Sequence, residues 1–313
     1  MLRVLKPGLL TTLQDEGRRG YLAHGVPLSG AMDRYAHRVA NLLVGNQAGE
    51  ATLEMTMSGG TFFFEEAMDV AVCGADMGGR LNGSRVKNWC CFKVPRSGML
   101  SFSYARQGCR SYLAVAGGFD AAPVLGSRST YVRASLGGFA GRALKAGDVL
   151  GRKSPQERRC SGKTLPDQYV PAYHNEVILR VLLGPQDDRF LPEGVRTFLS
   201  ATYVVTNRND RMGYVLRGPA VKHSNGADII SDALIPGSVQ VPGDGMPIVM
   251  MADCQTTGGY AKIATVISPD LALLAQGKTG DRVRFIRCSE AEAVEALREE
   301  QRRYREIGEF LQG

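Results

Sequence analysis

Short apolar runs of four to seven residues recur along almost the whole chain, and this pattern most constrains its fold. Most runs are flanked by Gly, Pro, Asn or Asp, the residues that end strands and form tight turns. Glycine supplies 38 of the 313 residues, well above the ~7% of an average protein. The pattern predicts a mainly β fold (α+β) with few helices. The expected strands are Thr61–Phe64, Val70–Cys73, Leu100–Tyr104, Tyr112–Ala116, Val177–Leu183, Tyr203–Thr206, Ile248–Ala252, Lys262–Ile267 and Val283–Ile286.

Helices are expected at three places. Residues 32–43 carry apolar side chains at the spacing of one helical face. Ser29 is expected to cap that helix, with anion binding at its N-terminus as the alternative. Ser268 is the expected N-cap of a short helix, and Ser289 with Glu292 forms a capping box before a last helix.

The length of the chain favours two domains. Residues 154–175 are polar, charged and contain proline, so we place a boundary within them. The expected division is a β-rich domain over residues 1–165, a β-barrel domain over 166–288, and a C-terminal helix over 289–313.

Charge and cysteine content narrow the class of protein. The formal charge of +7 divides into −3 over residues 289–313 (four Arg, seven Glu) and +10 elsewhere. The basic residues are scattered singly, which favours anionic metabolites over nucleic acid as ligands. Seven cysteines without metal-binding spacing indicate reduced thiols and no metal site. With no signal peptide or apolar run long enough to cross a membrane, we expect a soluble, cytoplasmic protein.

Familiar catalytic motifs are absent from the sequence. It has no complete phosphate-binding P-loop, no G-x-S-x-G elbow, no H-E-x-x-H and no G-x-G-x-x-G. What remains is three polar, glycine-containing segments, at residues 13–33, 207–214 and 253–260.

The segment 253–260 directly follows the expected strand Ile248–Ala252. Polar side chains at a strand end, followed by Gly258 and Gly259, allow a ligand to approach the backbone closely. A wide turn stabilised by its own Asp and Thr side chains explains the same residues equally well. In the segment 207–214, Arg211 is a candidate to grip a carboxylate or phosphate, although surface turns have a similar composition.

Together these segments resemble the allophanate hydrolase subunit 2 family, also called KipA-like or biotin-dependent carboxyltransferase-like proteins. The resemblance extends from about Leu2 to Ile286, and within the family it is strongest to the members that belong to bacterial ATP-dependent 5-oxoprolinases. The motifs that carry it are Thr12–Arg18, Gly25–Asp33, Asn41–Asn46, Ala116–Phe119, Asp210–Tyr214, Gln240–Pro242 and Asp253–Tyr260.

The resemblance implies cyclophilin-like β-barrel domains and a role in opening the lactam of 5-oxoproline to glutamate. It implies two protein partners, a KipI-like subunit (allophanate hydrolase subunit 1) and a LamB-like subunit. ATP is the expected cofactor, bound here or with a partner. Two alternatives stay open: half of a biotin-dependent carboxyltransferase, or a regulator that sequesters a KipI-like partner. The chain has no biotinylation motif, so we expect no covalent biotin on it.

The resemblance also directs the choice of site residues. Asp253 is expected to act as a base or as an orienting carboxylate. Thr256 and Thr257, with the amides of Gly258 and Gly259, are expected to stabilise a developing oxyanion. The remaining candidates for substrate binding are Arg211, Lys262, Gln255, Tyr260, Asp15, Ser29 and Asp33.

Overall fold

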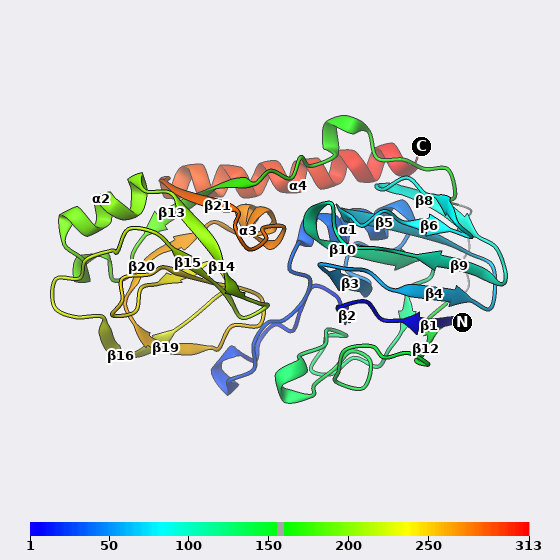
Figure 1. The fold of residues 1–313 in the computed structure, drawn as a ribbon, viewed down its shortest axis with the longest axis horizontal. Helices are drawn as coiled ribbons and strands as arrows, with labels where there is room; N and C mark the ends of the chain where they lie inside the picture. The colour runs from blue at the N-terminus through cyan, green and yellow to red at the C-terminus, as the bar shows by residue number, and fades with distance from the viewer. Residues whose placement is uncertain (155–159, 313) are drawn as a thin grey trace. The chain divides into compact units, whose positions relative to one another are not determined.

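The computed structural model describes residues 1–154 and 160–312; residues 155–159, part of the expected linker, lie outside the described residues. By its internal contacts the chain divides into two compact units. The first comprises residues 1–18, 29–173 and 302–313, and the second comprises residues 19–28 and 174–301. Both are built mainly from strands, which confirms the predicted fold class (Figure 1). The domain boundaries given above stay predictions.

Two antiparallel sheets form the first unit. One has the strand order β11 (Phe119–Asp120), β12 (Val149–Arg152), β1 (Leu2–Lys6), β4 (Thr61–Phe64), β9 (Gly98–Ser101), β6 (Arg80–Leu81) and β7 (Ser84–Arg85). The other has the order β2 (Leu10–Gln14), β3 (Thr52–Thr56), β10 (Gln107–Val115), β5 (Met68–Asp76) and β8 (Cys90–Val94).

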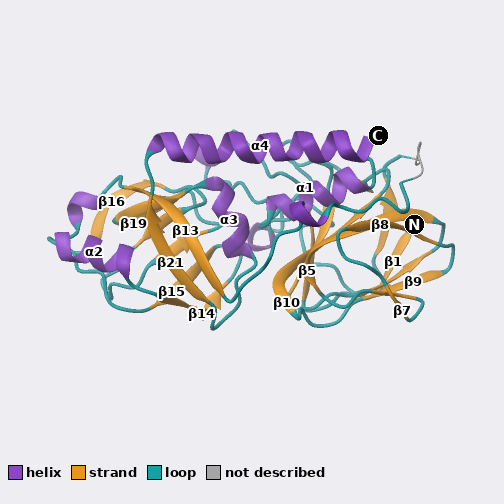
Figure 2. Cartoon of the chain, turned by 90° about the horizontal axis from the view of Figure 1, so that it is seen from above, coloured by secondary structure: helices purple, strands orange, loops and turns teal. Residues whose placement is uncertain are grey.

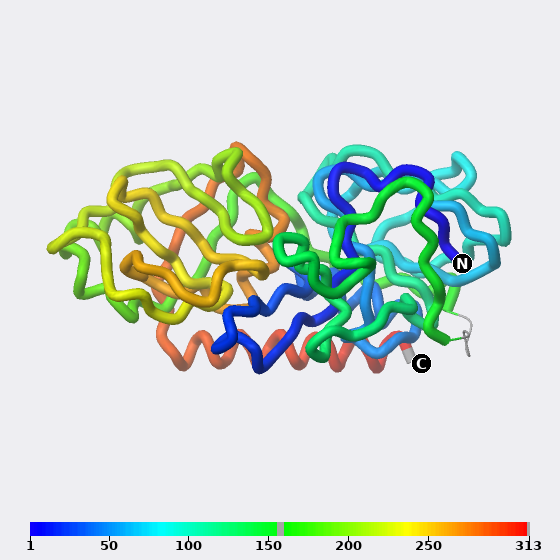
Figure 3. Tube along the Cα trace, turned by 90° about the horizontal axis from the view of Figure 1, so that it is seen from below, coloured from blue at the N-terminus to red at the C-terminus, as the bar shows by residue number. Residues whose placement is uncertain are grey.

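Side chains from both sheets share one buried core, to which β1, β4, β5 and β10 contribute Val4, Phe62, Val70 and Leu113. Strands distant in sequence are paired here. For example, β12 pairs with β1, with Leu150 opposite Leu2. Figure 3 shows the same units as a Cα trace, coloured along the chain.

Helix α1 (Arg34–Leu43) packs on β5 and β10 of the first unit (Figure 2). Its N-cap is Asp33, whose carboxylate accepts a hydrogen bond from the Ala36 N–H at 2.9 Å. The expectation that Ser29 caps this helix is therefore wrong. The helix begins five residues after Ser29, beyond the reach of a capping side chain, which bonds the second or third helical residue.

A closed seven-stranded barrel forms the second unit (Figure 1). Its order is β13 (Glu176–Leu183), β20 (Lys262–Val266), β17 (Ser238–Gln240), β18 (Ile248–Met250), β15 (Gly213–Arg217), β14 (Tyr203–Asn209) and β21 (Arg282–Arg287). Parallel pairing of β13 with β21, from Glu176 opposite Arg282 onward, closes the barrel. Buried and more exposed side chains alternate along β13, because one face of the strand points into the closed barrel. Val177, Leu179 and Val181 are the buried ones. A separate two-stranded ribbon joins β16 (Asp228–Ala233) to β19 (Thr257–Tyr260).

The remaining helices are α2 (Pro192–Ser200), α3 (Ser268–Ala275) and α4 (Glu290–Gln312). Ser268 lies inside α3, whose N-cap is Ile267 without a side-chain hydrogen bond, so the predicted Ser268 cap is wrong. The capping box before α4 is confirmed: Glu292 Oε2 accepts from the Ser289 N–H at 2.7 Å, and Ser289 Oγ accepts from the Glu292 N–H at 3.3 Å. Short 3-10 turns are Leu22–His24, Val132–Ala134, Asp167–Tyr169 and Asp187–Arg189. Within residues 1–154 and 160–312, no helix has the length and apolar character needed to cross a membrane.

Candidate functional site

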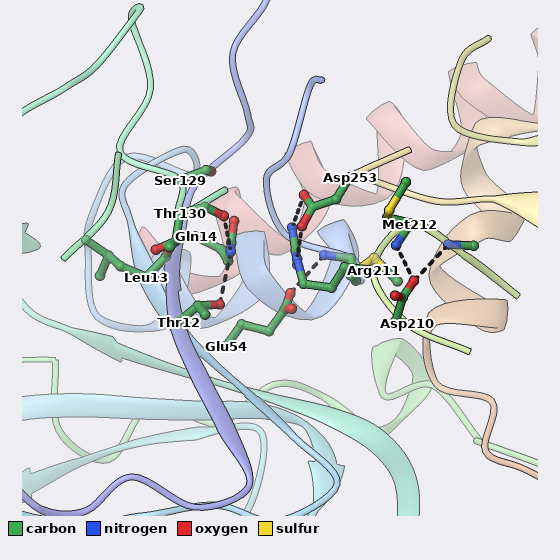
Figure 4. Close-up of polar contacts among 12 residues, drawn as sticks. Thr12, Leu13, Gln14, Glu54, Ser129, Thr130, Asp210, Arg211, Met212 and Asp253 are labelled. Atoms are coloured by element: carbon green, nitrogen blue, oxygen red, sulfur yellow. Dashed lines mark hydrogen bonds and ion pairs between the residues drawn. The ribbon is translucent and has the colours of Figure 1, made fainter. Parts of the chain in front are cut away.

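Two predicted site residues, Arg211 and Asp253, form a buried ion pair in the second unit (Figure 4). Arg211 Nε donates to Asp253 Oδ2 at 2.8 Å, and Arg211 Nη2 donates to Asp253 Oδ1 at 2.9 Å. Only 7% and 8% of the two side chains are exposed. Two parallel charge-assisted bonds fix both the distance and the orientation of the planar groups.

The barrel strands bring this pair together. Arg211 lies in the turn between β14 and β15, and Asp253 follows the end of β18, which pairs with β15. The Asp210 carboxylate accepts hydrogen bonds from the N–H groups of Met212 and Gly213, which shapes the turn (Figure 4). The backbone N–H of Asp253 also donates to the Arg211 carbonyl at 2.8 Å. Backbone and side chains therefore hold the two residues in one arrangement.

This geometry bears on the two roles expected for Asp253. Both of its carboxylate oxygens accept hydrogen bonds from Arg211, so both are already engaged with a cation of the same chain. The arrangement therefore favours an orienting role over that of a base. Arg211 is likewise engaged with a carboxylate of its own chain, so its expected grip on a ligand anion stays a prediction.

The residues after Asp253 run into strand β19. Cys254 is buried, and burial, reinforced by the nearby Asp253 charge, raises the pKa of its thiol to about 12, so the thiol is unreactive at neutral pH. Gln255 and Thr257 are exposed, while Thr256 is half-buried. The Gln240 side chain donates to the Tyr260 carbonyl at 3.1 Å.

An added side chain at Gly258 would require two neighbouring side chains to move. A Cβ built on it would lie 2.7 Å from both Gln240 Nε2 and Leu234 Cδ1. The backbone of β19 thus packs closely on the barrel, while the side chains of Thr257 and Tyr260 reach solvent.

Lys262, in β20, is almost fully buried and is neutralised within the second unit. Its Nζ donates to Asp232 Oδ2 at 2.5 Å and to the Ala233 carbonyl at 2.8 Å. The hydrogen bond from Lys262 is the main reason that the pKa of Asp232 falls to about 2. The pair links the barrel to the ribbon that contains β19.

Asp15, Ser29 and Asp33 belong to the first unit, whereas the other candidates belong to the second. Asp15 accepts hydrogen bonds from Ser127 Oγ at 2.6 Å, from Ser129 Oγ at 2.5 Å and from two backbone N–H groups. Burial alone raises the pKa of Asp15, but these hydrogen bonds outweigh it and hold the pKa below its ordinary value. The carboxylate therefore anchors the chain around residues 127–129.

Ser29 is the more unusual residue of that group. It is buried, its φ of 54° lies in the left-handed region, and its hydroxyl has no hydrogen-bond partner within the described residues. Strained backbone of this kind is concentrated at functional sites. Asp33, besides capping α1, accepts a hydrogen bond from the Tyr173 hydroxyl at 3.2 Å.

Comparison with known proteins places these residues in a family. The model of the carboxyltransferase domain, subdomain A and B, matches residues 24–287. The chain belongs to this carboxyltransferase domain family. It is 38% identical over 312 residues to the 5-oxoprolinase subunit designated C in Escherichia coli, covering 98% of this chain and 97% of that protein. It is also 32% identical over 320 residues to urea amidolyase of Saccharomyces cerevisiae, covering 96% of this chain but 17% of that protein.

A solved structure agrees with this assignment. The crystal structure of Kluyveromyces lactis urea amidolyase matches 98% of this chain with a TM-score of 0.92 and 30% sequence identity. The carboxyltransferase domain described here spans a fifth of that much longer chain.

Sequence reasoning missed two buried polar residues of this carboxyltransferase domain. Glu54 Oε2 accepts from the Met32 N–H at 2.9 Å and from the Tyr112 hydroxyl at 2.8 Å, and that hydroxyl accepts from the Asp33 N–H at 2.7 Å. Together they fix the backbone just before α1. The sequence signal for Glu54 is its place between the apolar residues Leu53 and Met55, where a charged side chain is unexpected in a buried strand.

Hydrogen bonds and ion pairs hold these polar groups in place. Within the described ranges 1–154 and 160–312, no group of three or more His, Cys, Asp or Glu side chains is arranged to hold a metal ion.

Proposed function

We propose that this chain is the subunit designated C of an ATP-dependent 5-oxoprolinase, which opens the lactam of 5-oxoproline to give glutamate. The observation that carries the proposal is the 38% identity to the Escherichia coli protein over nearly the full length of both chains. A match of that extent supports a shared role for the whole chain rather than a shared domain alone.

The chemistry explains why ATP is needed. An unstrained lactam resists hydrolysis, and phosphorylation of its oxygen makes the ring carbon a far better electrophile. Water then adds to that carbon and the ring C–N bond breaks, with the nitrogen taking up a proton, which leaves the γ-carboxyl of glutamate as an acyl phosphate. A second water hydrolyses this acyl phosphate to glutamate and inorganic phosphate.

In this chain we assign the Arg211–Asp253 pair to positioning the segment 253–260. We assign Thr256, Thr257 and the amides of Gly258 and Gly259 to stabilising the developing oxyanion.

The proposal includes two partners, a KipI-like subunit and a LamB-like subunit, with ATP bound either here or on one of them. Two relatives, from Escherichia coli and Haemophilus influenzae, are each named as one subunit of 5-oxoprolinase, which supports the need for further subunits. The chain alone is therefore expected to be inactive.

A second candidate is carboxyl transfer from biotin, which the family name and the urea amidolyase relatives favour. Biotin would then come from another protein. A third is regulation by sequestering a KipI-like partner, without catalysis.

Avidin separates the first two candidates. Glutamate release from 5-oxoproline by the assembled subunits should depend on ATP and be unaffected by avidin, because no biotin takes part. Release that avidin abolishes would contradict the proposal and support carboxyl transfer.

A further inference from the structure

The first unit contains a cavity that the assignments above do not use. Its volume is about 500 Å³, within the range of ~300–1,000 Å³ typical of small-molecule sites. Apolar side chains of Val86, Val170 and Pro171 form part of its wall. The polar part of the lining consists of Asp76, Arg85, Lys87, Asn88, Gln107 and Tyr173.

The charges on this lining favour a ligand with one negative charge. Arg85 is opposite Asp76, with 3.4 Å between Nη2 and Oδ2, so these two charges largely offset each other. Lys87 is exposed, and its ammonium forms no hydrogen bond or ion pair with any residue that the structure describes. The lining therefore carries a formal charge of +1, centred on Lys87.

Two side-chain amides supply acceptors for an N–H group. Gln107 donates from Nε2 to the Tyr173 carbonyl at 2.8 Å, which leaves its Oε1 for a ligand donor. Asn88 donates from Nδ2 to the Gly74 carbonyl at 2.8 Å, and its buried Oδ1 has no partner in the described part of the chain. A buried acceptor without a partner raises the free energy of the empty site, so a ligand donor that reaches it is favoured.

The cavity is connected to Asp33, a predicted binding residue, through Tyr173. Tyr173 lines the wall, and its hydroxyl donates a hydrogen bond to Asp33 Oδ2 at 3.2 Å. By contrast, the two cations expected to hold an anion in the second unit, Arg211 and Lys262, are each paired with a carboxylate.

We propose that this cavity binds a small monocarboxylate that also carries an N–H group, and that under the proposed function this ligand is 5-oxoproline. Lys87 pairs with the carboxylate, Gln107 Oε1 accepts the lactam N–H, and the ring packs on Val170 and Pro171. The volume leaves room for ordered water beside so small a ligand. The assignment of 5-oxoproline rests on the proposed function, whereas the ligand class rests on the cavity.

The test is a binding titration of the purified full-length chain, without partners or ATP, by calorimetry. Three probes are compared: 5-oxoproline, cyclopentanecarboxylate, which lacks the lactam N–H and its carbonyl, and 2-pyrrolidinone, which lacks the carboxylate. We expect 5-oxoproline to bind at least about tenfold more tightly than either analogue, since each analogue loses one hydrogen bond or ion pair.

Matched variants locate the binding. Lys87→Gln should weaken 5-oxoproline binding about tenfold, while Lys93→Gln, an equal loss of charge at the exposed position of β8, should leave it unchanged. Gln107→Leu should weaken 5-oxoproline but not cyclopentanecarboxylate. Equal affinity in Lys87→Gln and the unaltered chain, or no saturable binding of 5-oxoproline, would overturn the proposal.

The cavity assignment and the proposed function can fail separately. An assembled enzyme that releases glutamate with the same KM after Lys87→Gln would overturn the cavity assignment and leave the function standing. If the probes bind in the predicted order but the assembled complex releases no glutamate, the ligand class proposed for the cavity would be supported and the proposed function would be contradicted.

Discussion

Arg211 and Asp253 lie 42 positions apart in sequence, yet they form two parallel hydrogen bonds inside the second unit, at 2.8 and 2.9 Å. The β15–β18 pairing brings them together, and burial removes water from both charges. We therefore expect the pair to contribute strongly to the stability of the second unit.

Asp253→Asn should lower the free energy of unfolding by about 3–5 kcal/mol, because it removes one charge of a buried, doubly hydrogen-bonded ion pair. Urea denaturation measures the change. The matched control is Glu193→Gln, which breaks the exposed ion pair with Lys222 and should leave stability unchanged. Equal effects of the two substitutions would show that burial of the pair contributes nothing.

Much of the fold could be predicted because its signals are local. The strand β4 lies at its predicted residues, and the Ser289–Glu292 capping box forms as expected. The closing contact of the barrel could not be predicted, since β13 and β21 pair in parallel across a hundred residues of chain. Periodicity reports which face of a strand is buried and not which strand lies beside it.

Individual residues of the site could be predicted, but not the contacts between them. Composition indicated the segments that contain Arg211 and Asp253, and the family resemblance selected the two residues, but their pairing depends on the register of β15 against β18. Ser29 is the predicted cap of α1 because Ser is a frequent cap, whereas the true cap is Asp33, a predicted binding residue. Cavity residues such as Lys87 and Gln107 carry no sequence motif and are brought together only by the folded first unit.

Asp33→Ala should destabilise the protein by about 1 kcal/mol through loss of the α1 cap, with a further loss from the Tyr173 hydrogen bond. Ser29→Ala should change stability little, because the Ser29 hydroxyl has no partner among the described residues. Thermal unfolding of the two variants side by side checks the assignment. A larger effect at Ser29 than at Asp33 would contradict it.

His37 should make stability depend on pH. It is fully buried, with Nδ1 2.9 Å from Thr52 Oγ1, and burial lowers its pKa to about 4. Because the unfolded chain takes up this proton near pH 6.5 and the folded chain does not, stability should fall by about 3 kcal/mol as the pH drops from 6.5 to 4.

The comparison of His37→Gln with His24→Gln isolates this effect. Denaturant titrations between pH 7 and pH 4 should show a shallower dependence in His37→Gln, and an unchanged one in His24→Gln, since His24 is exposed. An unchanged dependence in both variants would assign the pH effect to other groups.

Gly30→Ala should destabilise more than Gly25→Ala, although both glycines have positive φ, 88° and 75°. An added Cβ at Gly25 meets nothing within 4 Å, so its cost is the left-handed backbone, about 1–2 kcal/mol. At Gly30 the same Cβ would lie 2.8 Å from the Gly17 nitrogen, adding a backbone clash. Equal unfolding free energies for the two variants would show that the backbone around Gly17 and Gly30 can move apart without loss of stability.

The role as a 5-oxoprolinase subunit is tested most directly by omission. The chain is assembled with its KipI-like and LamB-like partners, and glutamate release from 5-oxoproline is followed with and without ATP. The account predicts ATP-dependent release that disappears when this chain is left out. Undiminished release without the chain, or none from a stable complex of all three proteins, would contradict it.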